Sequence, residues 1–517
     1  MQRSPDIAAL LERPAREHPE RAALVHGVRT ISFGELAAAS ERLASALGLS
    51  PGERLVVVAP NVPALAVGLL AAWRSGAVAV PLSSRLRGFE LRRVFADVEP
   101  AAAVCAGGGT APGGFDVAAE IESLAPRTPT LAAHAVLDEL GEVLHRSRSG
   151  AREPAPSPPG LAAVLYTSGT TGEPRGAVIP HEMAVAMARN LAGALGEDAG
   201  ATYGMVVPAS HAFGLGCLLS GLGAGATAVL FEASASIDPL VRALRARRAP
   251  VLHGSPALFA RVLRTGLELP TRSGFVAGSP CPPAILRTLD ERGVRLLNLY
   301  GMTEIGATAC CRPGDPPETR HTTVGRPLDG YELRIAREPP SARSGGEQQA
   351  PGEVQVRSRY LPHGYHGRAW GEEELTGDGW FRTGDLGHLD GAGNLTIAGR
   401  AKEVVNVGGF NVFPAEVESF LLTHPAIEQA AVVGVAHPAM GEALQAFVVA
   451  APGETLEPRD VVRFAREGIA GYKLPYVVKV LETLPLLASG KPDRRALAGE
   501  ARAESESAPE PAGIGRP

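Results

Sequence analysis

The densest group of residues able to do chemistry in this chain is the segment Tyr166–Gly176, which reads Tyr-Thr-Ser-Gly-Thr-Thr-Gly-Glu-Pro-Arg-Gly. Its members that can contact an anion are Thr167, Ser168, Gly169, Thr170, Thr171 and Arg175. Glycines free backbone N–H groups to point at an anion, while hydroxyls and a guanidinium add side-chain donors. The apolar run Leu161–Tyr166 comes directly before and is typical of a buried strand. The pattern predicts a phosphate-binding loop at a strand end, although the Walker pattern GxxxxGK[ST] cannot be matched here.

Only four of the 50 basic residues are lysines: Lys402, Lys473, Lys479 and Lys491. Arginine presents a planar fork, whereas lysine is a compact point charge on a flexible stem. A chain that uses arginine almost everywhere retains lysine where a point charge is needed. Lys491 stands in a Ser-Gly-Lys-Pro sequence and Lys402 follows a Gly-Arg pair, so both are candidate functional residues. Lys479 is expected on the plain surface, and Lys473 is either an interdomain contact or a surface charge.

Four further segments are rich in glycine and polar residues. They are Asn298–Glu304 (Asn-Leu-Tyr-Gly-Met-Thr-Glu), Phe381–Leu386 (Phe-Arg-Thr-Gly-Asp-Leu), Gly399–Glu403 (Gly-Arg-Ala-Lys-Glu) and Gly408–Pro414 (Gly-Gly-Phe-Asn-Val-Phe-Pro). Taken in chain order with the loop after Tyr166 and the Ser-Gly-Lys sequence, they resemble the adenylate-forming superfamily. This superfamily contains acyl- and aryl-CoA synthetases, peptide-synthetase adenylation domains and luciferases. The resemblance covers almost the whole chain and is strongest toward fatty- and aryl-acyl-CoA ligases.

The resemblance implies an AMP-forming acid–thiol ligase that uses ATP, Mg²⁺ and CoA. In its first half-reaction a carboxylate attacks ATP, giving an acyl-adenylate and pyrophosphate. In the second, CoA displaces AMP to give the acyl thioester. Two anions must meet at the α-phosphate, so cations and oriented dipoles are needed to offset their repulsion.

The resemblance assigns the nucleotide contacts residue by residue. Thr167–Thr171 would bind the triphosphate, with Arg175 where the family usually has lysine. Thr303 would donate to the α-phosphate, and Glu304 would bind Mg²⁺, a hard cation that carboxylates suit. The other expected contacts are Gly278 and Ser279 near adenine, Asn298 at the base edge, Tyr300 and Gly301 on adenine, and Asp385 and Arg400 at the ribose.

The resemblance also implies roles in the last quarter of the chain. Lys491 would be the catalytic cation that reaches both the acyl carboxylate and the α-phosphate. Lys402 would be the hinge about which a small domain turns between the half-reactions. Gly408 and Gly409 would let the pantetheine arm of CoA pass close to the backbone.

The acid and the acceptor are less closely specified. His211 lies where acyl-CoA synthetases carry Pro-x-x-His-x-x-Gly and would stand beside the acyl carboxylate, a buried structural histidine being the alternative. Amino-acid-activating relatives place an aspartate near here, and its absence argues against an amino acid. The small residues 277–279, with Gly301 and Met302, would leave a mainly apolar cavity without a second anion partner, which favours a monocarboxylate, aliphatic or aromatic, over a dicarboxylate. The acceptor is CoA or, if the protein is an acyl-AMP ligase, a separate carrier protein. A hypothesis of another class is a catalytically silent adenylate-binding sensor or scaffold.

These residues must be positioned by a scaffold in which short β-branched runs alternate with amphipathic stretches. Leu55–Ala59 and Val294–Leu299 are runs of the first kind, and Ala64–Arg74 is one of the second. The alternation predicts an α/β fold with a large N-terminal domain, residues 1–400, of covered and mainly parallel sheets. Shorter units after Arg400 predict a smaller, mobile α+β domain over 401–500. Residues 501–517 are expected to form a disordered tail.

Composition narrows the class of protein further. The net charge of −5 indicates neither a nucleic-acid nor a membrane-surface partner. Five cysteines without a CxxC pair favour a reducing cytoplasm over a disulfide framework or a zinc site. Ala212–Phe231 is uncharged over twenty residues, but its five glycines predict a buried helix, a turn and a buried strand rather than a membrane span.

Overall fold

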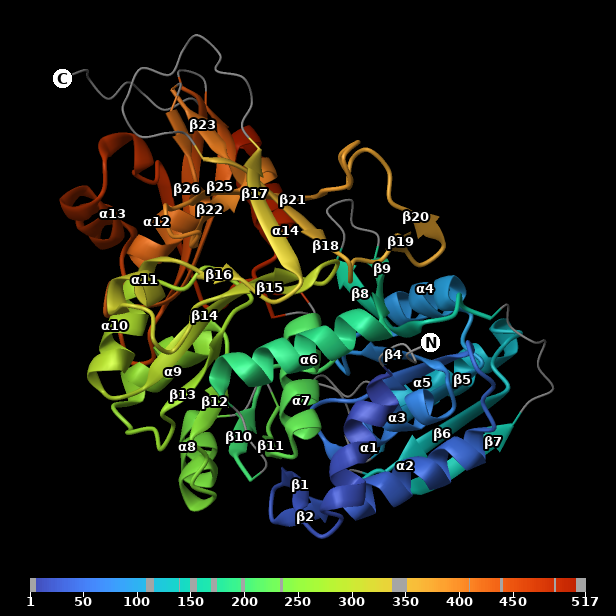
Figure 1. Ribbon diagram of the computed structural model, residues 1–517. Helices are drawn as coiled ribbons and strands as arrows, with labels where there is room; N and C mark the ends of the chain where they lie inside the picture. The colour runs from blue at the N-terminus through green and yellow to red at the C-terminus, as the bar shows by residue number, and fades with distance from the viewer. Residues whose placement is uncertain are drawn as a thin grey trace. The chain divides into compact units, whose positions relative to one another are not determined.

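The computed structural model describes residues 6–507 of the 517-residue chain, with gaps at 108–115, 139, 149–155, 169–173, 197–199, 233–235, 337–350, 409, 438–439 and 488–489. The chain forms two compact units (Figure 1). The large unit comprises residues 1–279, 286–333 and 356–381, and the C-terminal unit comprises 280–285, 334–355 and 382–517. The expected α/β class, with a large N-terminal part and a smaller C-terminal one, is confirmed.

The first nine-stranded sheet of the large unit has the strand order β20-β19-β9-β8-β4-β3-β5-β6-β7. Its strands are β3 (Arg54–Val58), β4 (Val78–Leu82), β5 (Ala102–Ala106), β6 (Ala133–Leu137), β7 (Val143–Arg148), β8 (Leu161–Ser168), β9 (Pro174–Pro180), β19 (Gly364–Tyr365) and β20 (Arg368–Ala369). The central strands β8, β4, β3, β5 and β6 run parallel. Strands β7, β9, β19 and β20 extend the two edges by antiparallel pairing.

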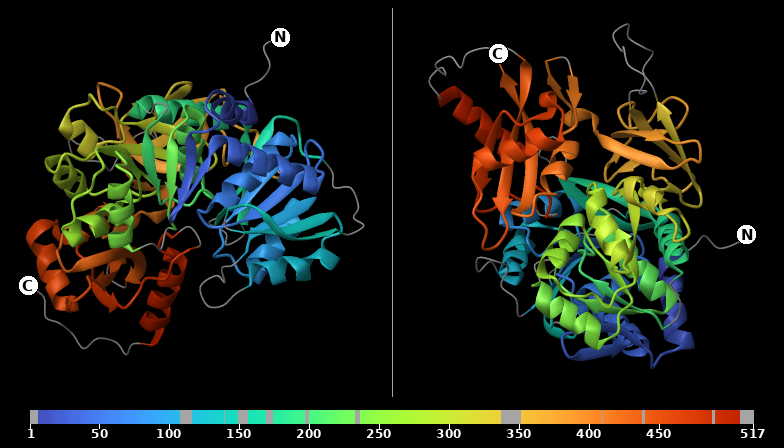
Figure 2. Two further views of the ribbon diagram at one scale, coloured as in Figure 1. Left: turned by 90° about the horizontal axis from the view of Figure 1, so that it is seen from below. Right: turned by 90° about the vertical axis from the view of Figure 1, so that its left-hand side faces the viewer.

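The central strands of this sheet are apolar on both faces because helices cover both (Figure 2, left). Successive side chains of a strand point to opposite faces. On β3, Val57 therefore joins a core that includes α3 (Pro63–Arg74), while Val56 joins another that includes α4 (Gly88–Val98) and α5 (Val117–Leu124). The near-continuous apolar runs read from the sequence are the consequence of this double burial.

The second nine-stranded sheet has the order β16-β15-β14-β13-β12-β10-β11-β1-β2. Its strands are β1 (Ala22–His26), β2 (Arg29–Ser32), β10 (Thr202–Met205), β11 (Thr227–Leu230), β12 (Val251–His253), β13 (Ser273–Val276), β14 (Arg295–Met302), β15 (Gly306–Cys310) and β16 (Arg326–Pro327). The six strands from β14 to β1 are parallel. Their carboxyl ends therefore share one edge, which is where open α/β sheets bind ligands.

The remaining helices of the chain up to residue 333 include α6 and α7, which pack on each other (Figure 1). They are α1 (Ile7–Glu17), α2 (Phe33–Leu47), α6 (His181–Leu195), α7 (Ala212–Ala224), α8 (Ile237–Ala246), α9 (Pro256–Thr265), α10 (Pro283–Glu291) and α11 (Pro317–Thr322), with a 3-10 turn at Ala125–Arg127. The prediction for Ala212–Phe231 is confirmed. Helix α7 is almost wholly buried and ends at Gly225, whose φ of 81° suits glycine, and the chain continues into buried β11.

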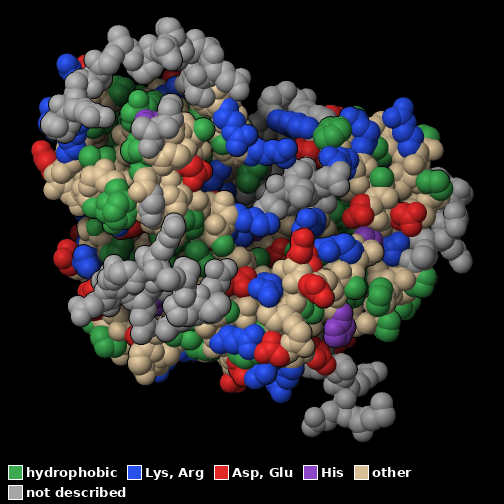
Figure 3. Space-filling view, turned by 90° about the horizontal axis from the view of Figure 1, so that it is seen from above, with side chains coloured by type: hydrophobic (Ala, Val, Ile, Leu, Met, Phe, Trp, Pro, Cys, Tyr) green, Lys and Arg blue, Asp and Glu red, His purple; other side chains and the backbone are tan. Residues whose placement is uncertain are grey.

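Among the described residues, none of the helices is long and apolar enough to cross a bilayer. Acidic and basic side chains are interspersed over the face drawn in Figure 3, as the small net charge predicts.

The C-terminal unit combines two smaller sheets with three helices. A four-stranded sheet of order β17-β18-β21-β22 contains β17 (Tyr331–Ala336), β18 (Gly352–Ser358), β21 (Phe381–Leu389) and β22 (Leu395–Arg400). A five-stranded sheet has β24-β23-β26-β25 in order, with β27 paired to β26. Its elements are β23 (Val405–Val407), β24 (Phe410–Val412), β25 (Ile427–His437), β26 (Gly441–Ala450), β27 (Val477–Leu481), α12 (Pro414–Leu421), α13 (Pro458–Gly468) and α14 (Arg494–Ser507), with 3-10 turns at Ala401–Glu403 and Gly471–Lys473.

Two predicted boundaries differ from the structure. The C-terminal unit takes in 382–400, because β21 and β22 pair with each other, whereas the sequence placed the domain boundary at residue 400. Residues 501–507 were expected in a disordered tail, but they continue α14, whose Leu497 and Ala501 are buried against β25 and β26. Residues 508–517 lie outside the described residues. A pivot near Lys402 stays a prediction.

Candidate active site

The predicted phosphate loop connects two antiparallel strands, β8 and β9. Thr167 pairs with Arg175 across this hairpin, and its hydroxyl donates to the Arg175 carbonyl at 3.4 Å. The Arg175 guanidinium carbon lies 5.7 Å from the centre of the Tyr365 ring. Gly169, Thr170 and Thr171 lie outside the described residues, as does the side chain of Ser168.

The adenine segment forms the end of β14 and its turn into β15. Gly301 has no space for a side chain, since a Cβ there would lie 2.1 Å from the Gly306 carbonyl oxygen. Tyr300 is 8% exposed, and Asn298 donates an amide hydrogen to the Thr323 carbonyl at 3.1 Å. These contacts hold β14 in place. The half-buried Thr303 and Glu304 lie in the turn that follows this strand.

Three predicted site segments lie at the same edge of the second sheet. His211 follows β10, Gly278 and Ser279 follow β13, and the Thr303–Glu304 pair follows β14. These strands are parallel, directly or through β12. His211 is half-buried at the N-terminus of α7, and Gly278 has a φ of 93°. The fold therefore brings together residues that are up to 93 positions apart in the sequence, from 211 to 304.

Asn61 fixes the segment that leads to His211, a role that sequence reasoning missed. Its side chain is 4% exposed. Its amide donates to the carbonyls of Val207 at 2.9 Å and Phe231 at 3.1 Å, and its oxygen accepts from the Ala209 N–H at 3.0 Å. The sequence offers no local signal, because the partners of Asn61 lie 146 to 170 positions further along the chain.

Tyr365 is a second residue that sequence reasoning missed. Its hydroxyl donates to Glu304 Oε1 at 3.2 Å. Burial raises the pKa of Tyr365 to about 12, and the nearby Glu304 carboxylate contributes in the same direction. The hydroxyl is therefore protonated at neutral pH and acts as a donor. The residues next to Tyr365 in the sequence, such as Pro362 and Gly364, predict a turn and give no indication of a contact with Glu304.

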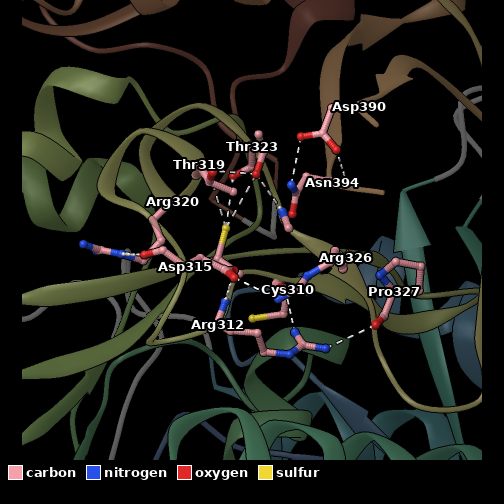
Figure 4. A network of polar contacts seen from close by, with 12 residues as sticks. Cys310, Arg312, Asp315, Thr319, Arg320, Thr323, Arg326, Pro327, Asp390 and Asn394 are labelled. Atoms are coloured by element: carbon pink, nitrogen blue, oxygen red, sulfur yellow. Dashed lines mark hydrogen bonds and ion pairs between the residues drawn. The ribbon is translucent and has the colours of Figure 1, made fainter. Parts of the chain in front are cut away.

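A polar network connects the residues around β14, β15 and β16 (Figure 4). Arg312 donates to the Pro327 carbonyl at 3.2 Å, and Asp315 pairs with Arg326 at 2.8 Å, which ties β15 to β16. The Cys311 backbone N–H donates to the Asn298 carbonyl at 3.0 Å. Buried Arg320 forms a two-pronged ion pair with Asp290, which holds the pKa of that carboxyl below its usual value against the opposing effect of burial.

The ribose pair of the C-terminal unit is a cross-strand contact. Asp385 on β21 and Arg400 on β22 are opposite each other, and Arg400 Nε lies 2.8 Å from Asp385 Oδ1. Thr383 braces the strand: its hydroxyl donates to the Val354 carbonyl at 2.6 Å and accepts from the Asp385 N–H at 3.0 Å. The Asp385 side chain, 7% exposed, is thus held in a defined orientation.

Lys491 lies in a tight turn that begins the last helical segment. Leu487 N–H donates to the Lys491 carbonyl at 2.8 Å, and Leu486 forms a single antiparallel bridge with Pro492. Lys491 itself is exposed. Backbone hydrogen bonds connect this turn to Pro492 and the residues after it. We therefore expect the position of Lys491 to depend on how those residues are held.

Arg494 anchors those residues. Its guanidinium bonds both oxygens of Glu418, at 2.7 Å for the Nη2 contact, donates to the Val432 carbonyl at 2.7 Å, and lies 3.5 Å from Glu403. Burial lowers the pKa of Arg494, but the Glu418 carboxylate more than offsets this and the pKa is raised. One half-buried ion pair, with its neighbouring contacts, therefore ties α12, β25, α14 and the turn that contains Lys402.

Among the other predicted residues of this unit, Lys402 and Gly408 are exposed, and Lys473 and Lys479 are half-buried. Lys402 lies in the 3-10 turn Ala401–Glu403, and Gly408, with a φ of 59°, begins the β23–β24 hairpin. Gly409 lies outside the described residues. Lys473 pairs with Glu416, which leaves its role open. The expectation that Lys479 is a plain surface residue was wrong, because it lies 3.0 Å from Glu500 with its side chain 22% exposed.

Comparison with known proteins decides the family. The AMP-binding enzyme family matches residues 11–366, and the AMP-binding enzyme C-terminal domain matches residues 416–491. The chain belongs to the AMP-binding enzymes. It is an ATP-dependent acyl-CoA ligase that acts through an acyl-adenylate.

Relatives of this ligase are similar over nearly their full length. A 3-[(3aS,4S,7aS)-7a-methyl-1,5-dioxo-octahydro-1H-inden-4-yl]propanoyl:CoA ligase of Mycobacterium tuberculosis is 33% identical over 510 residues, covering 94% of this chain and 97% of the relative. A feruloyl-CoA synthase of an Amycolatopsis species is 30% identical over 493 residues, covering 93% and 96%. The crystal structure of the anthranilate CoA ligase AuaEII with anthranoyl-AMP has a TM-score of 0.83, covers 98% of this chain and 99% of its own, and is 23% identical, which shows the fold.

The substrates of the ligase are a carboxylic acid, ATP and CoA. Its candidate site residues form two groups, one in each unit. The large unit contains the phosphate hairpin and the edge formed by His211, Gly278 and Glu304, and the C-terminal unit contains Asp385 and the Lys491 turn.

Proposed function

We propose that this acyl-CoA ligase activates a ring-bearing monocarboxylic acid. The observation that carries the proposal is the shared edge of the second sheet, where His211, Gly278–Ser279 and Glu304 follow parallel strands. The small residues Ala277 and Gly278 would leave space for a flat ring beside β14, and a Cβ added at Gly278 would meet no atom within 4 Å. The relatives named for a bicyclic propanoate and for ferulate act on acids of this kind, which supports the ring-bearing class among monocarboxylates.

Mg²⁺ would be held by Glu304 together with oxygens of ATP. Among the described residues there is no group of three His, Cys, Asp or Glu that could hold a metal ion by itself. Mg²⁺ usually binds one or two carboxylates together with substrate phosphates. Glu304 is half-buried and its Oε1 is taken by Tyr365, which leaves Oε2 as a ligand. The ion would lower the repulsion between the phosphates and the incoming carboxylate.

The protein's own groups would then divide the work. Thr167–Thr171 and Arg175 would hold the triphosphate, Thr303 the α-phosphate, and Asn298, Tyr300, Gly301, Gly278 and Ser279 the base. Asp385, oriented by Arg400, would accept from the ribose hydroxyls. His211 would stand beside the acyl carboxylate, and Lys491 would neutralise charge at the α-phosphate while the adenylate forms.

The second half-reaction would use the residues around the 3-10 turn. Lys402 would act as the hinge of a domain rotation. Gly408 and Gly409 would let the pantetheine arm run close to the backbone. Free CoA is the proposed acceptor, because the relatives are named as CoA ligases and none of these names supports a carrier protein. A cytoplasmic location stays a prediction from cysteine usage.

A panel of acids tests the proposal. The panel contains two ring-bearing acids, ferulate and 3-phenylpropanoate. It also contains a straight-chain monocarboxylic acid and a straight-chain dicarboxylic acid, each with as many carbons as 3-phenylpropanoate. We expect kcat/KM for AMP release to be at least about tenfold higher with the ring-bearing acids, a difference of about 1.4 kcal/mol. Preference for the straight-chain acid would reject the ring-bearing class. Acid-dependent pyrophosphate exchange that CoA does not convert into AMP release would favour carrier loading, and a lack of acid-dependent pyrophosphate exchange with every acid would favour the silent sensor.

A further inference from the structure

Tyr365 is attached to the phosphate hairpin through its backbone. It lies in β19, which pairs antiparallel with β9, and Tyr365 is opposite Ala177. The next residue, His366, donates its N–H to the Gly176 carbonyl at 2.7 Å. Gly176 directly follows Arg175, so the backbone of Tyr365 is fixed one or two residues from the exit of the predicted phosphate loop.

The Tyr365 side chain reaches a different sheet. Its hydroxyl donates to Glu304 Oε1, and Glu304 lies in the β14–β15 turn of the second nine-stranded sheet. This single residue therefore joins the hairpin expected to hold the triphosphate to the carboxylate expected to hold Mg²⁺. Both partners belong to the large unit.

The ring is held by two guanidinium groups. The Arg175 carbon lies 5.7 Å and the Arg368 carbon 5.1 Å from its centre. Arg368 also pairs with Glu374, whose Oε2 accepts from the Gly371 N–H at 3.0 Å. Cation–π contacts of this kind attract a guanidinium to the face of an aromatic ring. The two arginines therefore help to orient the ring in addition to the hydrogen bond of its hydroxyl.

This arrangement separates two opposite charges that the reaction needs apart. Glu304 and Arg175 both contact Tyr365, one at the hydroxyl and the other over the ring. A direct ion pair between them would have to break before the carboxylate could bind a cation and the guanidinium a phosphate. The Tyr365 hydroxyl, a neutral donor on Oε1, holds the carboxylate in place without using its second oxygen.

We propose that Tyr365 is a positioning residue for magnesium-nucleotide binding, which sets Glu304 and Arg175 at the spacing required by a metal-bound triphosphate. The proposal rests on the roles proposed above for Glu304 and Arg175. Tyr365 acts through these two residues, and the reacting atoms are contacted by others.

The test is the variant Tyr365→Phe, which removes the hydroxyl and retains the ring for both arginines. A hydrogen bond to a charged group is usually equivalent to about a tenfold change in an equilibrium constant. We expect the Mg²⁺ concentration for half-maximal pyrophosphate exchange to rise about tenfold, with the KM for the acid changed less than about twofold. Calorimetric titration with Mg·ATP should give a Kd raised by a similar factor. Tyr360→Phe is the matched control, because the Tyr360 hydroxyl contacts Arg359 rather than a carboxylate.

The possible results distinguish failure of the Tyr365 proposal from failure of the proposed function. An unchanged Mg²⁺ requirement and Mg·ATP Kd in Tyr365→Phe, with an active wild type, would overturn the proposal and leave the function standing. A wild type without Mg²⁺-dependent exchange would overturn both. If Tyr365→Phe is less stable to heat than Tyr360→Phe, a double-mutant cycle with Glu304→Gln decides. Additive effects on Mg·ATP binding would contradict the proposal, and a Tyr365→Phe effect that disappears in the Glu304→Gln background would support it.

Discussion

The phosphate hairpin and the lysine turn are two regions with similar tasks but different construction. The hairpin is built from full strands, β8 and β9, and Arg175 next to it is held by the Tyr365 ring that also engages Glu304. The lysine turn has a few backbone bonds between Leu486 and Pro492, and Lys491 itself is exposed. The strands on both sides of the predicted phosphate loop are thus held by regular pairing, whereas the proposed catalytic cation lies in a short turn.

The difference indicates how the ligase can use one site for two reactions. Groups that hold the nucleotide are needed in both half-reactions, so a rigid sheet edge suits them. A cation needed only for adenylate formation can lie on an element that leaves afterwards. The residues that attach the lysine turn to its own unit must nevertheless be held firmly. Arg494 does this through its contacts with Glu418, Val432 and Glu403.

The largest expected effect outside the lysine itself comes from removing the base of the turn. Arg494→Gln leaves the half-buried Glu418 without its cation, and partial solvation reduces the cost expected for a buried pair to about 2 kcal/mol, or about 30-fold in the opening equilibrium. Amide hydrogen exchange on β25 should therefore accelerate about 30-fold. Arg463→Gln is the control, because its partner Asp460 lies on the surface and the Arg463 side chain is 72% exposed. Equal exchange in both variants would mean that Arg494 does not anchor the turn.

The next effect is a selective loss of the second half-reaction, thioester formation. Lys402→Pro fixes φ in the 3-10 turn, so we expect pyrophosphate exchange to stay within about twofold while thioester formation falls at least about tenfold. Stopped-flow measurement of each half-reaction checks this. Lys402→Ala, which removes the charge and leaves the backbone free, should retain both. Normal thioester turnover in Lys402→Pro would reject the hinge.

The smallest effect concerns the departure from the family at Arg175. Arginine and lysine both bind phosphate, so Arg175→Lys should change the KM for ATP less than about threefold. Arg175→Ala should raise it about tenfold. Steady-state kinetics at saturating acid measures both. A loss above about 100-fold in Arg175→Lys would show that the planar fork over Tyr365 is required, and the hairpin would then be more specialised than we propose.

Local patterns predicted the fold and identified the segments that are expected to form the site. Buried strands such as β3 and β14 are apolar because both faces are covered, and Gly301 is required by the close approach of Gly306. Residues such as Thr167 and Asp385 lie in short segments whose own composition carries the signal. The same holds for the small C-terminal domain, where Pro414 begins α12 as its first-turn position predicts.

The positioning residues could not be predicted in this way. Asn61, Tyr365 and Arg494 act on partners 61 to 190 positions away, so no short window of the sequence contains both members of a contact. The end of α14, residues 501–507, was predicted to be disordered for a related reason. Its Ala, Glu and Ser composition lacks a strong apolar stripe, and Ala501 is ordered only because β25 and β26 lie beneath it.

The most direct test of the account measures the two half-reactions of Lys491→Ala. If Lys491 acts only while the adenylate forms, ATP–pyrophosphate exchange should fall about 100- to 1,000-fold, as for loss of one group that stabilises developing charge. Thioester formation from supplied acyl-adenylate and CoA should stay within about threefold of the wild type. Equal losses in the two half-reactions would contradict the division between the fixed nucleotide edge and the lysine turn.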